Sequence, residues 1–318
     1  MARPNGYRGV SPNAAQQHYD VSDEFFRIWL GSTLAYASAL WEDDDDTLEK
    51  AQLRKTDYLL DQAQVRPGHR VLDVGCGYGG ELRRLVEEYD VAAAVGLTLS
   101  EAGVEWVKRL NLPRTEVRLE NWIDHEPAEP YDAIISIETL EHFARPGMSS
   151  RAKIAGYREF FSRCHDWLRP EGRLVIQTIS WGHRFPLELS ILHDLYLATT
   201  VYPECNPSFF SELLAACDGL FDVVAMRNDF DHYSRTLEVW VDQLHAERKR
   251  AAELVGERKA RDFERCMTTA IRAFAEGWFY LYRLTFRPLP CPVRPARRFF
   301  INNVLGRDSV PMPRFIRR

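Results

Sequence analysis

Val71-Leu72-Asp73-Val74-Gly75-Cys76-Gly77-Tyr78-Gly79 is the stretch of the chain that decides the fold. A short run of branched apolar residues leads into an acidic residue and then into glycines, and a helical pattern follows over 81–88. This order predicts a buried parallel strand, a tight turn and a helix start, the place where an open α/β sheet binds nucleotide-like ligands. Gly75 and Gly77 lack a Cβ atom, so the backbone can adopt a positive φ and a ligand can lie against it.

The spacing of these glycines narrows the class of ligand. G-C-G-Y-G differs from the dinucleotide fingerprint G-x-G-x-x-G, and no basic residue stands where a phosphate would need one. An adenosine ligand without a pyrophosphate fits the pattern better, which indicates S-adenosylmethionine. The alternative is a glycine turn that serves tight packing and binds no ligand.

Size and composition are those of a soluble globular enzyme, since 45% of the 318 residues are hydrophobic and 27% are charged. A net charge of −5 argues against a surface that binds nucleic acid. The apolar runs are too short for an integral membrane segment, and the N-terminus lacks the apolar core of a secretion signal. The six cysteines form no C-x-x-C pair, so we expect reduced packing residues and no zinc site. The sequence therefore predicts a cytoplasmic enzyme without a bound metal.

Strands and helices are predicted to alternate through the middle of the chain. The strand candidates are 70–74, 91–97, 115–119, 131–136 and 172–179, and the helix candidates lie near 79–89, 100–110 and 148–168. Such alternation implies right-handed crossovers and a parallel sheet. Two further strand signals, at 221–230 and 278–286, flank a charged helical stretch at about 236–276.

The remaining segments are expected to be additions to one domain that spans 18–286. Residues 1–17 are polar and are predicted to be flexible, and apolar residues recur at helical spacing over 18–64. An aromatic, apolar helical insertion is expected at about 181–217. The extension 287–318 is rich in Arg and Pro, and it is either solvated or contacts a phosphate group or a partner.

An acidic run, Asp43-Asp44-Asp45-Asp46, comes directly before Thr47 and a helical pattern. Acidic residues at this position complement the positive end of a helix dipole. We therefore interpret the run as a helix cap rather than as a metal site.

Six further motifs flank the glycine turn on both sides. They are HYDVSDEFF from His18, YASA from Tyr36, TLEKAQ from Thr47, GLTLS from Gly96, SIETLEHF from Ser136 and HYSRTL from His232. In combination they resemble the motifs of the cyclopropane-fatty-acid synthase and mycolic acid methyltransferase family, from His18 to about Phe286. The resemblance implies a class I, Rossmann-like methyltransferase fold, with a seven-stranded and mostly parallel sheet, a helical N-terminal lid over 18–64 and a helical cap insertion.

The resemblance also implies a set of residues around S-adenosylmethionine. At matching positions these are Tyr36, Ser38, Gly75, Gly77, Thr98, Leu99, Trp122 and Ile137, with Asp124 near the adenine amine. The ring of Trp122 offers an aromatic face to the adenine, although the same residue can also be plain core. The family's glutamine after G-L-T-L-S, a ribose contact, is Gly103 here, so the ribose must use another group, for which Glu101 is a candidate.

The catalytic set departs from the family at informative positions. The resemblance implies a bicarbonate base, held by a backbone amide, a glutamate, a glycine, a strand histidine and a tyrosine. This chain retains the glutamate as Glu141 and the tyrosine as Tyr233. It has Glu138 in place of the glycine, Gln177 in place of the histidine, and Ser38 in place of the cysteine of the family's Y-S-C-A motif.

Glu138 matters most among these departures, because its carboxylate and a bicarbonate would repel each other. We therefore hypothesise that bicarbonate is absent and that Glu138, sharing a proton with Glu141, supplies the base or stabilises a substrate cation. The alternative is that Glu138 lies at the rim or binds a cofactor hydroxyl. His142 is a candidate second base or a residue that holds a loop, and Tyr233 is expected to hold Glu141 or to face the cation.

Together these features predict an S-adenosylmethionine-dependent C-methyltransferase that acts on an unsaturated, apolar or isoprenoid-like small molecule. A cyclopropane synthase, a small-molecule N- or O-methyltransferase and a cofactor-binding accessory subunit are the alternatives. A nucleic-acid methyltransferase is disfavoured, because basic and aromatic residues are not interleaved over the core. The sequence is compatible with a homo-oligomer.

Overall fold

The computed structural model describes residues 9, 11, 22–184, 201–202 and 204–292. Its centre is a sheet with the strand order β3-β2-β1-β4-β5-β8-β7, and the short strand β6 pairs with β5 off this path. The strands are β1 (Arg70–Val74), β2 (Ala93–Thr98), β3 (Thr115–Leu119), β4 (Tyr131–Ile137), β5 (Leu168–Trp181), β6 (Ser208–Phe209), β7 (Phe221–Asn228) and β8 (Phe279–Pro288). The prediction of a seven-stranded, mostly parallel sheet is confirmed, since only β8 runs antiparallel to its neighbours β5 and β7 within the described strands.

The strand order reverses direction at β1. The chain moves outward from β1 to β2 and β3 and then returns to place β4 on the other side of β1. The carboxyl ends of β1 and β4, at Val74 and Ile137, are therefore neighbours, and parallel sheets bind their ligands at such a reversal. The glycine turn quoted above begins directly after Val74.

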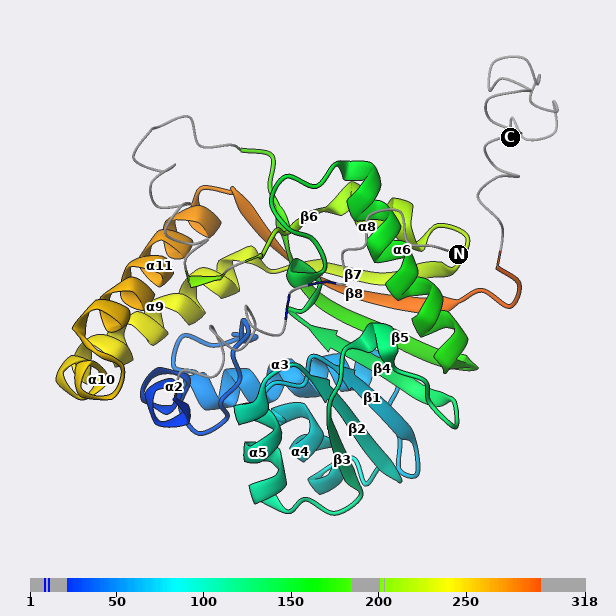
Figure 1. The fold of residues 1–318 in the computed structure, drawn as a ribbon, viewed down its shortest axis with the longest axis horizontal. Coiled ribbons are helices and arrows are strands. Elements are labelled where there is room, and N and C mark those ends of the chain that lie inside the picture. The colour runs from blue at the N-terminus through cyan, green and yellow to red at the C-terminus, as the bar shows by residue number, and fades with distance from the viewer. Residues whose placement is uncertain (1–8, 10, 12–21, 185–200, 203, 293–318) are drawn as a thin grey trace.

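Helices cover both faces of the sheet, because successive residues of each strand point to opposite sides. Val71 of β1 packs with residues of α3 (Leu48–Gln62) and α4 (Gly80–Glu87), and Val107 of α5 (Glu101–Leu110) joins this cluster. Leu72 and Val74 pack on the other face with α6 (Ser150–Trp167) and α8 (Phe210–Cys217). Figure 1 shows α6 and α8 side by side on one side of the strands, and α3 and α4 lie on the other side.

A third group of helices forms a layer beside the sheet rather than over its faces. It consists of α2 (Asp23–Leu30), α9 (Phe230–Ala246), α10 (Arg248–Val255) and α11 (Glu257–Ala275). Their apolar faces share one cluster, which includes Trp29, Trp240 and Phe263. Helices α9 and α11 of this group supply one wall of a cavity described below.

The boundaries of the helical stretch expected at 236–276 differ from the prediction. Strand β7 ends at Asn228 and α9 begins at Phe230, so the helix starts six residues before the expected position. Gly256, with a φ of +84°, then ends α10 and precedes α11. The pattern of charged residues continues across this break, and for this reason the sequence indicated a single helical stretch.

The acidic run lies directly before α3, whose N-cap is Thr47. The hydroxyl oxygen of Thr47 accepts a hydrogen bond from the backbone N–H of Lys50 at 3.2 Å. Asp46 accepts the backbone N–H groups of Glu42 and Asp43 and pairs with Arg54. The cap is therefore built by Thr47, and Asp46 fixes the loop that leads into it.

Several predicted segments lie wholly or partly outside the described residues. These are the flexible N-terminus, the HYDV part of the motif at His18, the middle of the insertion expected at 181–217, and the tail beyond 292. At the end of the insertion, α8 packs against α6 and joins the core of the sheet. Cys291 is exposed, so the expectation that every cysteine is a packing residue is wrong there. Among the described residues, no helix has the length and apolar character that a membrane span requires.

Candidate active site

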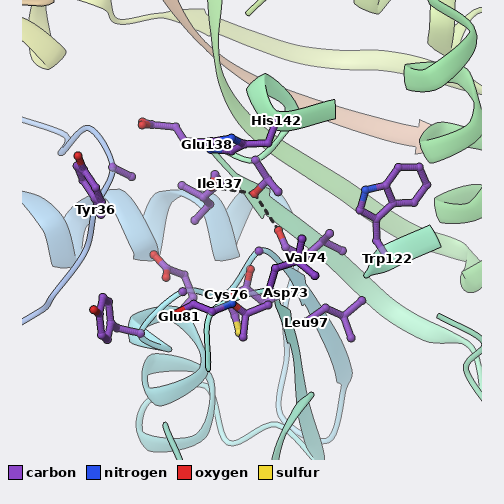
Figure 2. Close-up of a pocket in the computed structure, with 18 of the residues that line it drawn as sticks. Tyr36, Asp73, Val74, Cys76, Glu81, Leu97, Trp122, Ile137, Glu138 and His142 are labelled. Carbon is purple, nitrogen blue, oxygen red and sulfur yellow. Dashed lines mark hydrogen bonds between the residues drawn. The ribbon is translucent and has the colours of Figure 1, made fainter. Parts of the chain in front are cut away.

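The glycine turn is held between two strand ends. Gly75 has a φ of +87°, and a Cβ atom there would overlap the hydroxyl of Thr139, so only glycine fits without displacing Thr139. The hydroxyl of Thr139 lies 3.1 Å from the carbonyl oxygens of both Val74 and Ile137 (Figure 2). The backbone N–H of Gly75 donates to the carbonyl of Leu97 at 2.9 Å. The turn is thus fixed from β2 on one side and from β4 on the other.

A cavity of about 150 Å³ opens over this turn, and we call it the turn cavity. Seven of the residues predicted to surround a cofactor line it: Tyr36, Gly75, Gly77, Thr98, Leu99, Trp122 and Ile137. Figure 2 shows Tyr36 and Trp122 at opposite sides of this cavity, with Glu138 and His142 along one edge and Asp73, Cys76 and Glu81 along the facing edge. The structure therefore brings together these residues from five separate segments of the chain.

Trp122 serves both as wall and as core. Its ring packs against Phe143 with 4.9 Å between centroids and against Phe160 with 5.3 Å. Only 7% of Trp122 is exposed, and this residue lines the turn cavity. The two interpretations of Trp122 from sequence are thus compatible with each other.

The polar residues near Trp122 differ from those that the sequence indicated. Asp124 lies in the short helix η1 (Trp122–Asp124) and is not among the residues that line the turn cavity, so its role near an adenine stays a prediction. Glu120 and Asn121, which precede Trp122, line it instead. Glu101, the candidate ribose ligand, is likewise not among the lining residues, whereas Ser100 is.

Gly103 has a structural reason to be glycine. A Cβ atom at this position would lie 2.6 Å from the carbonyl oxygen of Gly77, closer than real Cβ contacts. The first turn of α5 therefore approaches the backbone of the glycine turn directly. A longer side chain at 103 would push the glycine turn away from α5.

The floor of the turn cavity carries a buried ion pair that the sequence analysis missed. The ammonium of Lys55 lies 2.6 Å from a carboxylate oxygen of Glu81, which also accepts the hydroxyl of Thr56 at 3.2 Å. Burial opposes ionisation of Glu81, yet the charge of Lys55 and its hydrogen bond lower the pKa of Glu81. Burial and the charge of Glu81 raise the pKa of the neighbouring Asp73 well above its ordinary value. The available signal was a lysine on the apolar face of the helix at 48–62.

These features fit S-adenosylmethionine. One end of the turn cavity is aromatic and suits an adenine, while the other carries paired charges and suits the ammonium and carboxylate of an amino acid. The glycine turn between them leaves room for a ligand against the backbone.

A second and larger cavity of about 310 Å³ lies between the sheet and the helical layer, and we call it the apolar cavity. It is lined mainly by apolar and aromatic side chains from β5, α9, α11 and the start of β8, including Ile179, Leu237, Met267, Phe274 and Phe279. Tyr36, Glu138 and His142 line both cavities, so the two spaces meet at these three side chains. The hydroxyls of Tyr36 and Tyr202 form a hydrogen bond of 2.5 Å at the same boundary.

Glu138 occupies a strained backbone position at this boundary. Its φ is +49°, a backbone conformation that residues other than glycine adopt rarely and at a cost of about 1 kcal/mol or more. The resemblance places glycine at this position in the family, so the backbone has the glycine conformation while the side chain is a carboxylate. Its backbone N–H donates to the carbonyl of Gln177 at 2.7 Å, which holds the strained residue against β5.

Three donors surround the carboxylate of Glu138. One oxygen accepts the backbone N–H of Ser38 at 2.9 Å and the side-chain amide of Gln177 at 2.8 Å. The other oxygen accepts the hydroxyl of Tyr233 at 2.6 Å. Burial raises the pKa of Glu138, and these three hydrogen bonds act against that rise. Burial and the charge of Glu138 raise the pKa of Tyr233 well above its ordinary value, so the proton stays on the phenol.

Glu141 lies close to Glu138 but binds different donors. One of its oxygens accepts the hydroxyl of Thr178 at 2.9 Å and the backbone N–H of Ile179. The other oxygen is buried and has no protein hydrogen-bond partner among the described residues. Burial and the charge of Glu138 raise the pKa of Glu141 to about 8. Glu141 is therefore mainly protonated at neutral pH, and a proton shared with Glu138 stays a prediction.

His142 lies in the turn η2 (Leu140–Phe143) that follows β4. Burial lowers the pKa of His142 to about 4, so the imidazole is neutral at pH 7 and is a weaker base than an exposed histidine. It lines both cavities, which leaves both sequence interpretations of His142 open.

Comparisons with known proteins give one consistent result. Residues 10–284 match the family described as mycolic acid cyclopropane synthetase. The chain is 33% identical over 285 residues to cyclopropane mycolic acid synthase MmaA2 of Mycobacterium tuberculosis, covering 85% of this chain and 95% of that protein. The structure of MmaA2 superposes with a TM-score of 0.80 at 30% identity, over 87% of this chain and 98% of that one. The structure of mycolic acid cyclopropane synthase CmaA1 with S-adenosylhomocysteine (SAH) and CTAB also gives a TM-score of 0.80, at 31% identity over 88% of this chain and 99% of that one.

Proposed function

Because the chain belongs to the mycolic acid cyclopropane synthetase family, we propose that it methylates a carbon atom of an unsaturated, apolar or isoprenoid-like small molecule. The family makes the chain an S-adenosylmethionine-dependent methyltransferase, and the related CmaA1 binds SAH. What distinguishes this chain is the base. The observation that carries the proposal is the carboxylate of Glu138, which accepts hydrogen bonds from Ser38, Gln177 and Tyr233.

These three donors stand at positions where the resemblance places ligands of bicarbonate. Ser38 corresponds to the backbone amide, Gln177 to the strand histidine and Tyr233 to the tyrosine. A carboxylate and bicarbonate have the same charge and a similar planar arrangement of oxygens. We infer that the side chain of Glu138 takes the place of the bound anion, and that the base is thereby part of the protein.

The residues that would hold the cofactor line the turn cavity. Trp122 would lie beside the adenine, and the Lys55–Glu81 pair would meet the charged amino-acid end. When bound, S-adenosylmethionine supplies a methyl group that already carries its activating positive charge on sulfur. The chain's own residues therefore position the acceptor, exclude water and receive a proton.

The acceptor would lie in the apolar cavity, next to Glu138 and Tyr36. When an alkene carbon takes the methyl group, the C–S bond breaks with its electron pair on sulfur, and a cation is left on the neighbouring carbon. The carboxylate of Glu138 and the aromatic faces of Tyr36 and Tyr233 would stabilise this cation. Glu138 would then remove a proton from a carbon beside the cation, and the C–H electron pair would form the new double bond.

Ring closure to a cyclopropane is the second candidate, and the relatives favour it because those named above are cyclopropane synthases. In that reaction the base removes a proton from the transferred methyl group instead. An N- or O-methyltransferase would use Glu138 to deprotonate a heteroatom. An accessory subunit would bind the cofactor and have no turnover of its own.

Two measurements test the proposal. The purified chain is assayed in buffer depleted of bicarbonate with trideuteriomethyl-labelled cofactor and a panel of unsaturated lipids, prenyl compounds and aromatic metabolites. A product with three deuterium atoms is a methyl product, and one with two is a cyclopropane. We expect bicarbonate-independent formation of the methyl product, its loss in Glu138→Gln, and unchanged SAH affinity in that variant. Full activity of Glu138→Gln would contradict the role of Glu138.

A further inference from the structure

Gln177 is the donor to Glu138 whose side chain could face it with either of two different groups. An amide side chain has one oxygen and one NH2 group, and rotating it by 180° exchanges the two. A carboxylate accepts a hydrogen bond only from the NH2 group. A contact that holds the other end of the Gln177 amide therefore adds to what decides which end faces Glu138.

Arg283 makes that contact. It lies directly opposite Gln177 in the antiparallel pairing of β5 with β8, and both side chains are buried. The Nε–H of Arg283 donates to the amide oxygen of Gln177 at 2.8 Å. A guanidinium has five N–H donors and no acceptor, so only the oxygen of the amide can face it.

We propose that Arg283 is a positioning residue that fixes the amide of Gln177 with its NH2 group toward Glu138. The two hydrogens of this NH2 group then meet two acceptors, the carboxylate of Glu138 at 2.8 Å and the carbonyl of Ser38 at 3.2 Å. In the reversed orientation the amide oxygen would face both of these acceptors, and the NH2 group would face a cation. The inference rests on the proposed role of Glu138 and extends it to β8.

Arg283 is itself held in place by two further groups. One terminal nitrogen pairs with the carboxylate of Asp229, the residue between β7 and α9. The other terminal nitrogen donates to the carbonyl of Ala39 at 2.9 Å, next to the Ser38 amide that binds Glu138. The same guanidinium therefore orients Gln177 and fixes the loop that carries the second donor.

The loss of the Gln177 donor has a defined electrostatic consequence. A hydrogen bond to the charged form of a carboxylate lowers its pKa, so losing this bond raises the pKa of Glu138 further. The other titratable and charged groups around Glu138 are Tyr36, Lys55, Glu141, His142, Tyr233 and Arg283 itself. All of them except Arg283 are retained in the variants below, and Asp229 is neutralised together with Arg283, so the net charge of this region does not change.

The test uses a paired variant, because removing Arg283 alone would leave the charge of Asp229 buried without a partner. In Asp229→Asn/Arg283→Gln the residue at 283 can either donate or accept, so it no longer fixes the amide oxygen of Gln177, and only Glu138 and Ser38 hold the NH2 group. We expect the acid limb of the pH profile of kcat/KM to move to higher pH by about one unit. On the acid side of this limb, kcat/KM should then be roughly tenfold lower than in the wild type. Arg283→Lys is the matched control, because an ammonium, like a guanidinium, can only donate hydrogen bonds. The acid limb of the pH profile of this variant should stay in place.

A direct titration separates this inference from the proposed function. The carboxyl carbon of Glu138 is followed by 13C NMR across pH, and its resonance is assigned by its absence in Glu138→Gln. The paired variant and Gln177→Met should each raise the pKa of Glu138 by about one unit, and the triple variant should raise it no further. This result holds even where Glu138 proves not to be the base.

Two outcomes would overturn the inference. One is an unchanged Glu138 titration in the paired variant while Gln177→Met shifts it, since Arg283 would then not act through Gln177. The other is a Glu138 titration that Gln177→Met leaves in place, since the amide would then not matter to the carboxylate. The second outcome can be observed even where the paired variant does not fold.

Discussion

The phenol of Tyr233 donates a hydrogen bond of 2.6 Å to the carboxylate of Glu138, from a residue 95 positions later in the chain. Tyr233 comes from the helical layer and Glu138 from the end of β4, so this bond joins the two parts of the molecule that enclose the apolar cavity. The ring of Tyr233 packs against that of Phe274 of α11, with 4.5 Å between the ring centroids and an angle of 31° between the planes. The bond therefore ties the protonation state of Glu138 to the packing of the helices.

Tyr233→Phe should impair catalysis more than folding. The phenylalanine ring retains the packing against Phe274, whereas Glu138 loses one of three donors. A hydrogen bond to a charged group contributes about 1.5–3 kcal/mol, so we expect kcat/KM to fall roughly 10- to 100-fold near neutral pH. The acid limb of the pH profile should move upward, because the pKa of Glu138 rises. A variant with the wild-type pH profile would show that this bond does not act on the base.

Glu141→Gln should change how stability depends on pH. The folded pKa of about 8 lies above the ordinary value of 4.5, so the folded protein retains a proton that the unfolded chain releases between these values. Stability from this group is therefore fully present below about pH 4.5 and is lost as the pH rises to about 8, with a slope of up to about 1.4 kcal/mol per pH unit. A glutamine at position 141 does not titrate, so the variant does not lose this stability. The free energy of unfolding of Glu141→Gln should therefore rise relative to that of the wild type as the pH rises. Urea unfolding at pH 5, 6.5 and 8 measures the difference, and a constant difference across this range would argue against a raised pKa.

Gly103→Ala and Gly156→Ala form a matched pair of substitutions within helices. At Gly103 the new Cβ atom would lie 2.6 Å from the backbone oxygen of Gly77, whereas at Gly156 it would lie 3.7 Å from the nearest atom, the oxygen of Phe143. We expect Gly156→Ala to stabilise the protein by about 0.5–1 kcal/mol through helix propensity. Gly103→Ala should destabilise it by about 1–3 kcal/mol and weaken SAH binding, since the glycine turn must move.

Gly103→Gln, which installs the residue expected from the family, should weaken SAH binding as well rather than restore a ribose contact. Thermal unfolding and calorimetric titration with SAH provide both measurements. Equal effects of alanine at 103 and 156 would mean that the glycine turn tolerates the displacement.

The sheet was the most predictable part of the molecule, for a physical reason. A parallel strand buried on both faces needs a continuous apolar run, and the run at 70–74 coincides with β1. The start of α9 at Phe230 and the break at Gly256 were less visible, because charged helical spacing continues through both positions.

The candidate site was predictable as a set of residues but not as an arrangement. Glu138, Glu141 and Tyr233 follow from motif positions, whereas the contact of Glu138 with Ser38 depends on how a loop and a strand end meet in three dimensions. Arg283 was not singled out from the sequence, yet it is buried beside Asp229 and Gln177. Buried charges of this kind depend on partners that are distant in sequence, and local patterns do not report them.

The most direct test of the account is rescue of Glu138→Gly by an added anion. Glycine accepts the φ of +49° without strain, and the variant leaves an opening lined by the donors Ser38, Gln177 and Tyr233. Activity should be lost in buffer depleted of bicarbonate and should return in a saturable manner with bicarbonate or formate, while chloride at equal ionic strength has no effect. Glu138→Gln, which fills the opening, should not be rescued. Undiminished activity of Glu138→Gly without any added anion would contradict the claim that the carboxylate of Glu138 is the base.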